Sequence, residues 1–208
     1  MMKLTINQNK QNEYERVTVE CQVATPKPLV VWQDKLNRVL PQLRLQDSHD
    51  LHVTICHFGK PQDLFIEVMS SGSEIDFAQF MEHFYEFLNN CQIIYRSFRG
   101  NSISATAHRL KFLRSRQQRV IVLDLGRPDV LHQIRIRIAD QLKIFLNKCE
   151  ILDPIDFIRH SSNLRYALSE SSFHLTLGRT KGEIKDLPKL ATKFVIKLNL
   201  PALRNVSV

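Results

Sequence analysis

Two short segments of the chain repeat one pattern, a histidine and a threonine two residues apart among apolar residues; they read LHVTI from position 51 and FHLTL from position 173. The polar residues of the pattern are His52, Thr54, His174 and Thr176. Side chains of a strand alternate between its two faces, so each segment is predicted to be a strand with its histidine and threonine on one face and a core on the other. Two such strands side by side would combine two imidazoles that exchange protons near neutral pH with two hydroxyls that hold an oxyanion.

Each motif segment comes last in a similar series of predicted elements. In the first half, the alternation of residues 16–23 predicts a strand, and apolar residues spaced by three and four over residues 29–43 predict a helix. In the second half, the same patterns predict a strand over residues 119–125 and a helix over 130–149, followed by a loop over 154–170. The sequence therefore predicts two matched halves, each with the order strand, helix, loop and motif strand.

Between the halves, buried phenylalanines predict a helix over residues 76–89, and residues 91–98 and 101–107 are predicted to form a hairpin. Residues 193–198 alternate again and predict a late strand. These elements indicate an α+β fold. We expect a bilobal, pseudo-symmetric duplicated fold with mostly antiparallel sheets, outer helices and a central cleft.

At 208 residues and 43% hydrophobic content, the chain has the size of one domain. We therefore expect a single domain over residues 1–208. Its lobes are expected over roughly residues 11–70, with parts of 71–118, and over 119–208. Without a run of about 18 apolar residues or an apolar leader in the first fifteen residues, a membrane span and a secretory signal are not expected, and we expect a cytoplasmic protein.

Four cysteines stand singly along the chain among apolar residues, which favours buried thiols over disulfides or zinc ligands. Cys56 follows the first motif directly, and strict alternation predicts it on the same face as Thr54 and His57 on the opposite face. A nucleophilic Cys56 is an alternative, but the second motif has Gly178 at the equivalent position.

A formal charge of +8 favours polyanionic partners, nucleic acid first among them. The excess is concentrated in one segment that contains no acid and includes the basic residues Arg96, Arg99, Arg109, Lys111, Arg114, Arg116 and Arg119. Tyr95, Phe98 and Phe112 lie among them. Such a segment suits phosphate contacts and base stacking, although a charge run is also typical of a solvated face.

The two motifs resemble the paired His-x-Thr-x signatures of the 2H phosphoesterase superfamily. LHVTICHFG (51–59) and FHLTLGR (173–179) are similar to the motifs of bacterial enzymes called 2′-5′ RNA ligases or RNA 2′,3′-cyclic phosphodiesterases. The resemblance covers roughly residues 16–179. It implies a bilobal fold whose central cleft carries both motifs, and metal-independent cleavage or opening of a phosphodiester without a cofactor.

Carried over to this sequence, the resemblance implies that His52 and His174 are the catalytic pair and that Thr54 and Thr176 hold the phosphate oxygens. For a 2′,3′-cyclic phosphate, one neutral imidazole would take a proton from the attacking water, and the other, as imidazolium, would protonate the departing ribose oxygen. Which histidine is base and which is acid stays open. The expected partner is an RNA or nucleotide substrate, and we expect a monomer.

Four further residues are candidates for substrate binding. Lys60 and Arg179, just beyond the two motifs, are positioned to neutralise phosphate, and Tyr166 and Phe173 are candidates to stack a base. For each of them the alternative is an ordinary structural role, as a surface cation or a buried ring.

Three other functions compete with this interpretation. The first is a metal site built from His49, His52, His57 and His174, against which the expected opposite faces of His52 and His57 argue. The second is a binding module that holds RNA ends or nucleotides in the same basic cleft without turnover. The third is ligation, in which a hydroxyl replaces water, although water at about 55 M should favour hydrolysis.

Overall fold

The two motif segments form neighbouring strands, β3 (His52–Gly59) and β7 (Phe173–Thr180), in the middle of one curled antiparallel sheet. The structure is a computed structural model that describes residues 16–24, 27–98, 103–114, 119–181, 187, 189 and 193–204. The sheet has the strand order β4-β8-β1-β3-β7-β6-β5, and the short strand β2 pairs with β7. Every strand pairing is antiparallel.

The remaining elements have the following bounds. The strands are β1 (Val17–Val23), β2 (Arg44–Leu45), β4 (Ile103–Ala107), β5 (Arg109–Arg114), β6 (Arg119–Gly126) and β8 (Phe194–Arg204). The helices are α1 (Lys27–Val39), the short 3₁₀ helix η1 (Ser48–Asp50), α2 (Pro61–Met69), α3 (Phe77–Ser97), α4 (Asp129–Lys148) and α5 (Pro154–His160).

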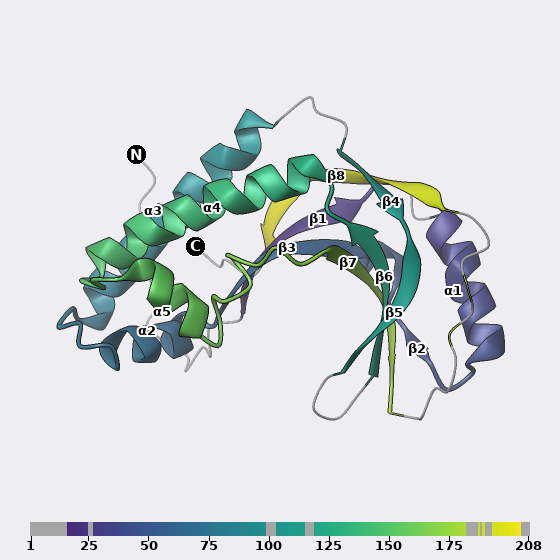
Figure 1. Cartoon of the computed structure of the whole chain (residues 1–208), viewed down its shortest axis with the longest axis horizontal. Coiled ribbons are helices and arrows are strands. Elements are labelled where there is room, and N and C mark those ends of the chain that lie inside the picture. Colours follow the sequence, from purple (N-terminus) through teal and green to yellow (C-terminus); the bar gives the residue numbers. More distant parts are fainter. Residues whose placement is uncertain are drawn as a thin grey trace, which may run out of the picture.

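The α+β fold and the mostly antiparallel arrangement are confirmed. In both halves a strand leads into a helix, and the motif strand then pairs with that first strand: β3 with β1, and β7 with β6. Figure 1 shows the curled sheet with α3 and α4 side by side on one side of the molecule and α1 on the other. The centre of the sheet is therefore made by corresponding strands of the two halves.

The core lies on one face of the motif strands and under the long helices. Val53 and Leu175 are completely buried, and so are Phe80 and Phe84 of α3. The rings of Phe80 and Phe84 both contact Phe145 of α4 edge to face. One face of β3 and β7 is thus buried in the core. The opposite face of these strands is left to carry polar residues.

One predicted element is wrong. Residues 91–98 are not the first strand of a hairpin, because α3 continues to Ser97. Its buried residues Phe84, Leu88, Cys91 and Tyr95 keep the helical spacing of three and four, which outweighs the local preference of the β-branched residues for a strand. The second predicted strand exists as β4, but it pairs with β8.

The loop predicted over residues 154–170 contains the short helix α5. Asp153 caps this helix, because its carboxylate accepts a hydrogen bond from the N–H of Asp156, and Pro154 occupies the first turn. Aspartate at the N-cap and proline at the first position are a common way to begin a helix.

Candidate active site

The motif strands meet near their first residues. β3 and β7 are paired at Val53 and Leu175, whose side chains both point into the core. In an antiparallel pair, the residue before one paired position lies across from the residue after the other paired position. These neighbours point to the face of the sheet opposite to the side chains of the paired residues. Each motif histidine therefore lies across from the threonine of the other motif, so the four polar residues share one face of the sheet.

Each motif strand has a β-bulge directly after its threonine. Ile55 is the extra residue in β3, because the pairing with β1 shifts there, and Leu177 is the extra residue in β7, because the pairing with β6 shifts there. A bulge changes the alternation of side chains by one residue. The next residue on the face of the motif is consequently His57 in β3 and Arg179 in β7.

Two predictions from strict alternation are corrected by the first bulge. Cys56 does not share the face of Thr54, since its side chain is buried, and His57 does not lie on the opposite face, since it follows the motif on the same one. Burial raises the pKa of the Cys56 thiol to about 12, against a smaller opposing effect of the positive charge of Arg135. This thiol is therefore kept protonated and is a poor nucleophile.

Two buried side chains, Gln33 and Arg135, donate hydrogen bonds to the bulges; we call them the bulge donors. Gln33 Nε2 on α1 donates to the carbonyl of Leu177 at 3.3 Å, and Arg135 Nε on α4 donates to the carbonyl of Ile55 at 3.2 Å. Both donors are only 5–6% exposed. The helix of each half thus supports the motif strand of the other half.

Arg135 makes the larger set of contacts. Its Nη1 donates to the carbonyls of Ser169 and Ser171 at 2.9 and 3.2 Å, just before β7 begins. Its guanidinium carbon lies 3.8 Å from the centre of the Phe173 ring. Arg135 therefore connects α4 to β3 and to the start of β7.

Glu20 lies beside His52 in the first half. It sits across from Thr54 on β1, is 5% exposed, and accepts a hydrogen bond from the Thr18 hydroxyl at 2.9 Å. His52 Nε2 is 3.2 Å from Glu20 Oε1, and His52 Nδ1 is 2.6 Å from the carbonyl oxygen of Asp50. Both ring nitrogens of His52 therefore lie beside an oxygen that can accept a hydrogen bond.

Asp124 occupies the corresponding region of the second half, across from His174 on β6. Its carboxylate lies 2.5 Å from Lys111 Nζ and 3.2 Å from Arg109 Nε, and it accepts the Gly126 N–H at 3.2 Å. Burial disfavours its charge, but these hydrogen bonds outweigh burial and lower the pKa of Asp124 to about 2. Asp124 is therefore ionised at neutral pH.

His174 lies among groups of both charges. Desolvation of the ring is the first cause that lowers the pKa of His174, and the charge of Arg135 is the second. Lys111 and His52 lower it further, and Asp124 opposes them. The two motif histidines are thus close enough to affect each other's charge, and the neutral form of His174 is favoured.

The four substrate-binding candidates lie in different places. Arg179 is on the motif face of β7, and Lys60 is at the start of α2, at the far end of β3 from His52. Tyr166 is exposed on the turn before β7, with Arg165 over its ring. Phe173 is 1% exposed under Arg135, so it is not placed to stack a base.

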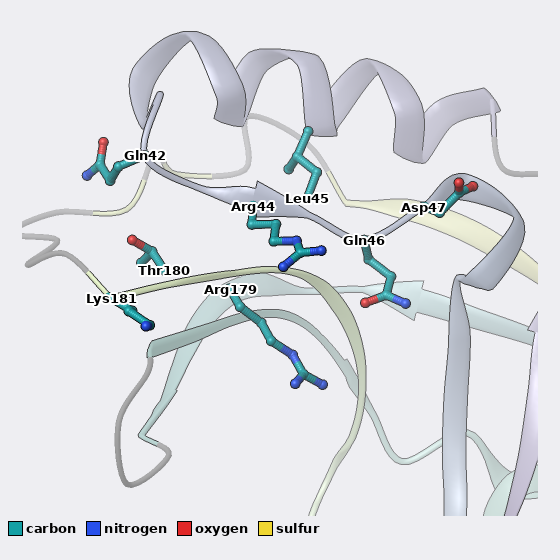
Figure 2. A pocket seen from close by; sticks show the side chains of 8 residues that line it. All are labelled: Gln42, Arg44, Leu45, Gln46, Asp47, Arg179, Thr180 and Lys181. Carbon is teal, nitrogen blue, oxygen red and sulfur yellow. The ribbon is translucent and has the colours of Figure 1, made fainter.

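A cavity of about 840 Å³ adjoins Arg179, where β2 runs beside β7 (Figure 2). Its lining residues are Gln42, Arg44, Leu45, Gln46, Asp47, Arg179, Thr180 and Lys181. Arg44 is paired with Arg179 across the two strands, so both arginines lie on the same face.

The described residues of the basic segment lie in different surroundings. Arg109 and Lys111 face Asp124, while Tyr95 and Phe98 are buried and so are not available to stack bases. Arg99 and Arg116 lie outside the described residues, and Arg96 is exposed at the end of α3. The expected interleaving of cations and rings is therefore wrong for Tyr95 and Phe98.

The four cysteines are all buried and unpaired, as predicted. Within the described ranges, no group of three or more His, Cys, Asp or Glu side chains is arranged to hold a metal ion. None of the helices in those ranges is long and apolar enough to cross a membrane.

Sequence reasoning missed the residues that support the motifs: Glu20, Gln33, Arg44, Asp124 and Arg135. Two of them carried a signal. Glu20 and Asp124 are acids inside otherwise apolar strands, where a charge is rarely buried without a function or a partner. The bulge donors carried none, because a glutamine or arginine on a helix is ordinarily a surface residue.

The chain is similar to several solved structures. The protein TT0787 of Thermus thermophilus is 14% identical, with 92% of this chain and 95% of that chain covered and a TM-score of 0.50. Escherichia coli LigT in its apo form is 13% identical (94% and 96% covered, TM-score 0.49), and a phosphoesterase is 13% identical (93% and 96% covered, TM-score 0.47).

No protein-family model matches the chain, and no curated protein sequence matches it. The chain therefore shares the fold of TT0787, and at 14% identity this likeness shows the fold alone.

Proposed function

We propose that the chain is a metal-independent phosphodiesterase that acts on RNA ends or nucleotides, hydrolysing a 2′,3′-cyclic phosphate or a 2′-5′ linkage. The observation that carries the proposal is the register at Val53 and Leu175, which sets each motif histidine across from the threonine of the other motif. A phosphate bound between the strands would meet both imidazoles and both hydroxyls.

In this proposal His174 is the general base and His52 the general acid. The lowered pKa of His174 favours the neutral imidazole, which can take a proton from water attacking phosphorus. The Nδ1 of His52 lies 2.6 Å from the carbonyl oxygen of Asp50, which leaves Nε2, beside Glu20, as the nitrogen that would protonate the departing ribose oxygen. Thr54 and Thr176 would donate to the phosphoryl oxygens, where negative charge builds in the transition state.

The test uses adenosine 2′,3′-cyclic phosphate and a 2′-5′ linked oligoadenylate, with products followed by chromatography. We expect turnover that persists with a chelator, and a loss in kcat of about 10²- to 10⁴-fold in His52→Ala and in His174→Ala. His160→Ala is the matched control, because His160 is exposed on α5 beside Asp156.

Full activity in either motif variant would contradict the proposal. If the wild-type protein binds these ligands but turns over no phosphodiester, the chain is a binding module for nucleotides or RNA ends. Activity that is lost with a chelator and restored by zinc would indicate a metal site instead.

A further inference from the structure

The cavity between β2 and β7 is positively charged on one side. Arg44, Arg179 and Lys181 line it, and in Figure 2 the two arginine side chains extend to the same side of the strands, together with Gln46. Among the residues that the structure describes, none of the three cations forms an ion pair. Two arginines and a lysine in one cavity suit a phosphate, to which arginine can donate two parallel hydrogen bonds.

The one acid of the lining faces elsewhere. Asp47 accepts the N–H of His49 at 2.9 Å, as the cap of η1, and its side chain points away from the arginines in Figure 2. The cavity therefore keeps its excess of positive charge.

Fixed backbone contacts hold the two arginines together. The N–H of Gln46 donates to the carbonyl of Leu177 at 2.8 Å, and Gln33 Nε2 donates to the carbonyls of Gln46 at 2.7 Å and Leu177 at 3.3 Å. Gly178 makes the close approach of β2 possible, since a Cβ there would lie 2.8 Å from the carbonyl oxygen of Arg44. Arg44 is thus positioned by the same buried contacts that hold the bulge of β7.

The cavity lies beside the proposed reaction centre and does not coincide with it. Across the bulge, Thr176 pairs with Val122 and Arg179 with Val120, so the two positions are two residues of β6 apart, about 7 Å, whereas a hydrogen bond spans about 3 Å. The bulge at Leu177 keeps Arg179 on the face of the motif. A phosphate held by the histidines and threonines would leave the cations of the cavity to meet a second anionic group of the same substrate.

We infer that this cavity binds the phosphate on the 5′ side of the reacting nucleotide. That phosphate is either the phosphodiester that joins the nucleotide to an RNA strand or a terminal 5′-phosphate. The inference rests on the proposed function, which places the reacting phosphate between the two motifs. It predicts that the substrate is recognised through two successive phosphates.

The experiment compares kcat/KM for three substrates: adenosine 2′,3′-cyclic phosphate, its 5′-phosphorylated form, and a triadenylate that ends in a 2′,3′-cyclic phosphate. The proteins are the wild type, Arg44→Gln, and the control Lys35→Gln, which removes a cation over Trp32 on α1. Binding of a triadenylate 3′-phosphate and of 3′-AMP is measured by titration in parallel.

We expect the wild-type protein to prefer the triadenylate over the unphosphorylated nucleotide by about tenfold or more, mainly through KM. Arg44→Gln should reduce this preference at least fivefold, and Lys35→Gln should leave it unchanged. If the 5′-phosphorylated nucleotide and the triadenylate show an equal increase in kcat/KM over the unphosphorylated nucleotide, the cavity binds any 5′-phosphate. If only the triadenylate shows the increase, the cavity binds the phosphodiester of an RNA strand.

The inference is overturned if the protein turns over all three substrates equally, or if the preference survives in Arg44→Gln. If no substrate is turned over, the proposed function fails. The titrations then decide the inference separately, because a triadenylate 3′-phosphate that binds no tighter than 3′-AMP overturns it as well.

Discussion

The two halves of the molecule share one backbone plan and differ in the side chains placed around it. In both, the motif is followed by a bulge that accepts a hydrogen bond from a buried donor on the helix of the other half. Around His52 the neighbouring charge is the carboxylate of Glu20, while His174 is close both to the carboxylate of Asp124 and to the cations Arg135 and Lys111. A repeated backbone thus places the two motif histidines in different electrostatic surroundings.

The two halves also differ in the residue that follows each bulge. β3 has the buried Cys56, whereas β7 has Gly178, over which β2 passes. Among the described residues, it is β7 of the second half that gains a short neighbouring strand, β2, and with it Arg44 beside its motif. A binding cavity can be added to one half of a duplicated fold in this way without altering the motifs themselves.

The largest expected effect tests whether the two bulge donors are equivalent. Arg135→Met should lower the free energy of unfolding by about 3 kcal/mol, because the buried carbonyl of Ile55 and the partly buried carbonyls of Ser169 and Ser171 lose their donor. Gln33→Leu removes the donor of two carbonyls and should cost about 1–2 kcal/mol. Both are measured by urea unfolding.

Arg137→Met is the control for Arg135, since Arg137 lies on the same helix and contacts the Phe98 ring at 5.0 Å. It should cost less than about 1 kcal/mol. A larger effect in Gln33→Leu than in Arg135→Met would show that the two halves are not supported as described.

The next effect concerns the acid of the second half. Asp124→Asn should lower the free energy of unfolding by about 2 kcal/mol at neutral pH, because the folded state lowers the pKa of Asp124 to about 2. A depressed carboxyl pKa stabilises the fold above the pKa of the unfolded chain, and this stabilisation is lost as the pH falls toward 2.

Denaturant unfolding of the wild type and of Asp124→Asn, followed from pH 7 to pH 2, measures this difference. The two stabilities should converge at the acid end, where Asp124 is protonated. A difference that is independent of pH would mean that the charge of Asp124 contributes nothing to stability.

A smaller effect distinguishes the residues after the two bulges. Gly178→Ala should cost about 1–3 kcal/mol, because the added Cβ meets the Arg44 carbonyl oxygen at 2.8 Å and β2 must shift. Cys56→Ala only removes a buried sulfur and should cost about 1 kcal/mol. Crystal structures of both variants would show whether β2 alone moves; an unmoved β2 in Gly178→Ala contradicts the argument.

The smallest expected effect is a shift in the pH profile of kcat/KM. Arg135 lowers the pKa of His174, so Arg135→Met should raise that pKa toward its ordinary value. The base must be neutral, and the acidic limb of the profile should therefore move to higher pH by less than about one unit. Gln33→Leu carries no change of charge and should leave the limb in place, whereas a shift to lower pH in Arg135→Met would refute the assignment of His174 as base.

Much of the fold follows from the sequence because its signals are periodic. The strands and helices of both halves show apolar spacings of two or of three and four, and β1, β6 and α4 lie within one or two residues of their predicted bounds. The bulges left no such signal, since one extra residue changes neither composition nor spacing in a visible way. Cys56 and His57 were therefore assigned to the wrong faces.

The motif residues were predictable, and their surroundings were not. His52 and His174 belong to a repeated local pattern, whereas Glu20, Arg44 and Arg135 reach the site only through strand pairing and helix packing. Contacts of this kind depend on how distant segments are arranged, which local periodicity does not encode.

The position of β8 has a consequence for how the protein is made. β8 lies between β4 and β1, so residues up to Arg204 must leave the ribosome before β1 can acquire its second neighbour. Pairings between such distant segments form slowly. Because β8 is also the last strand to be synthesised, the sheet around β1, which carries Glu20, is the last part of the sheet to be completed.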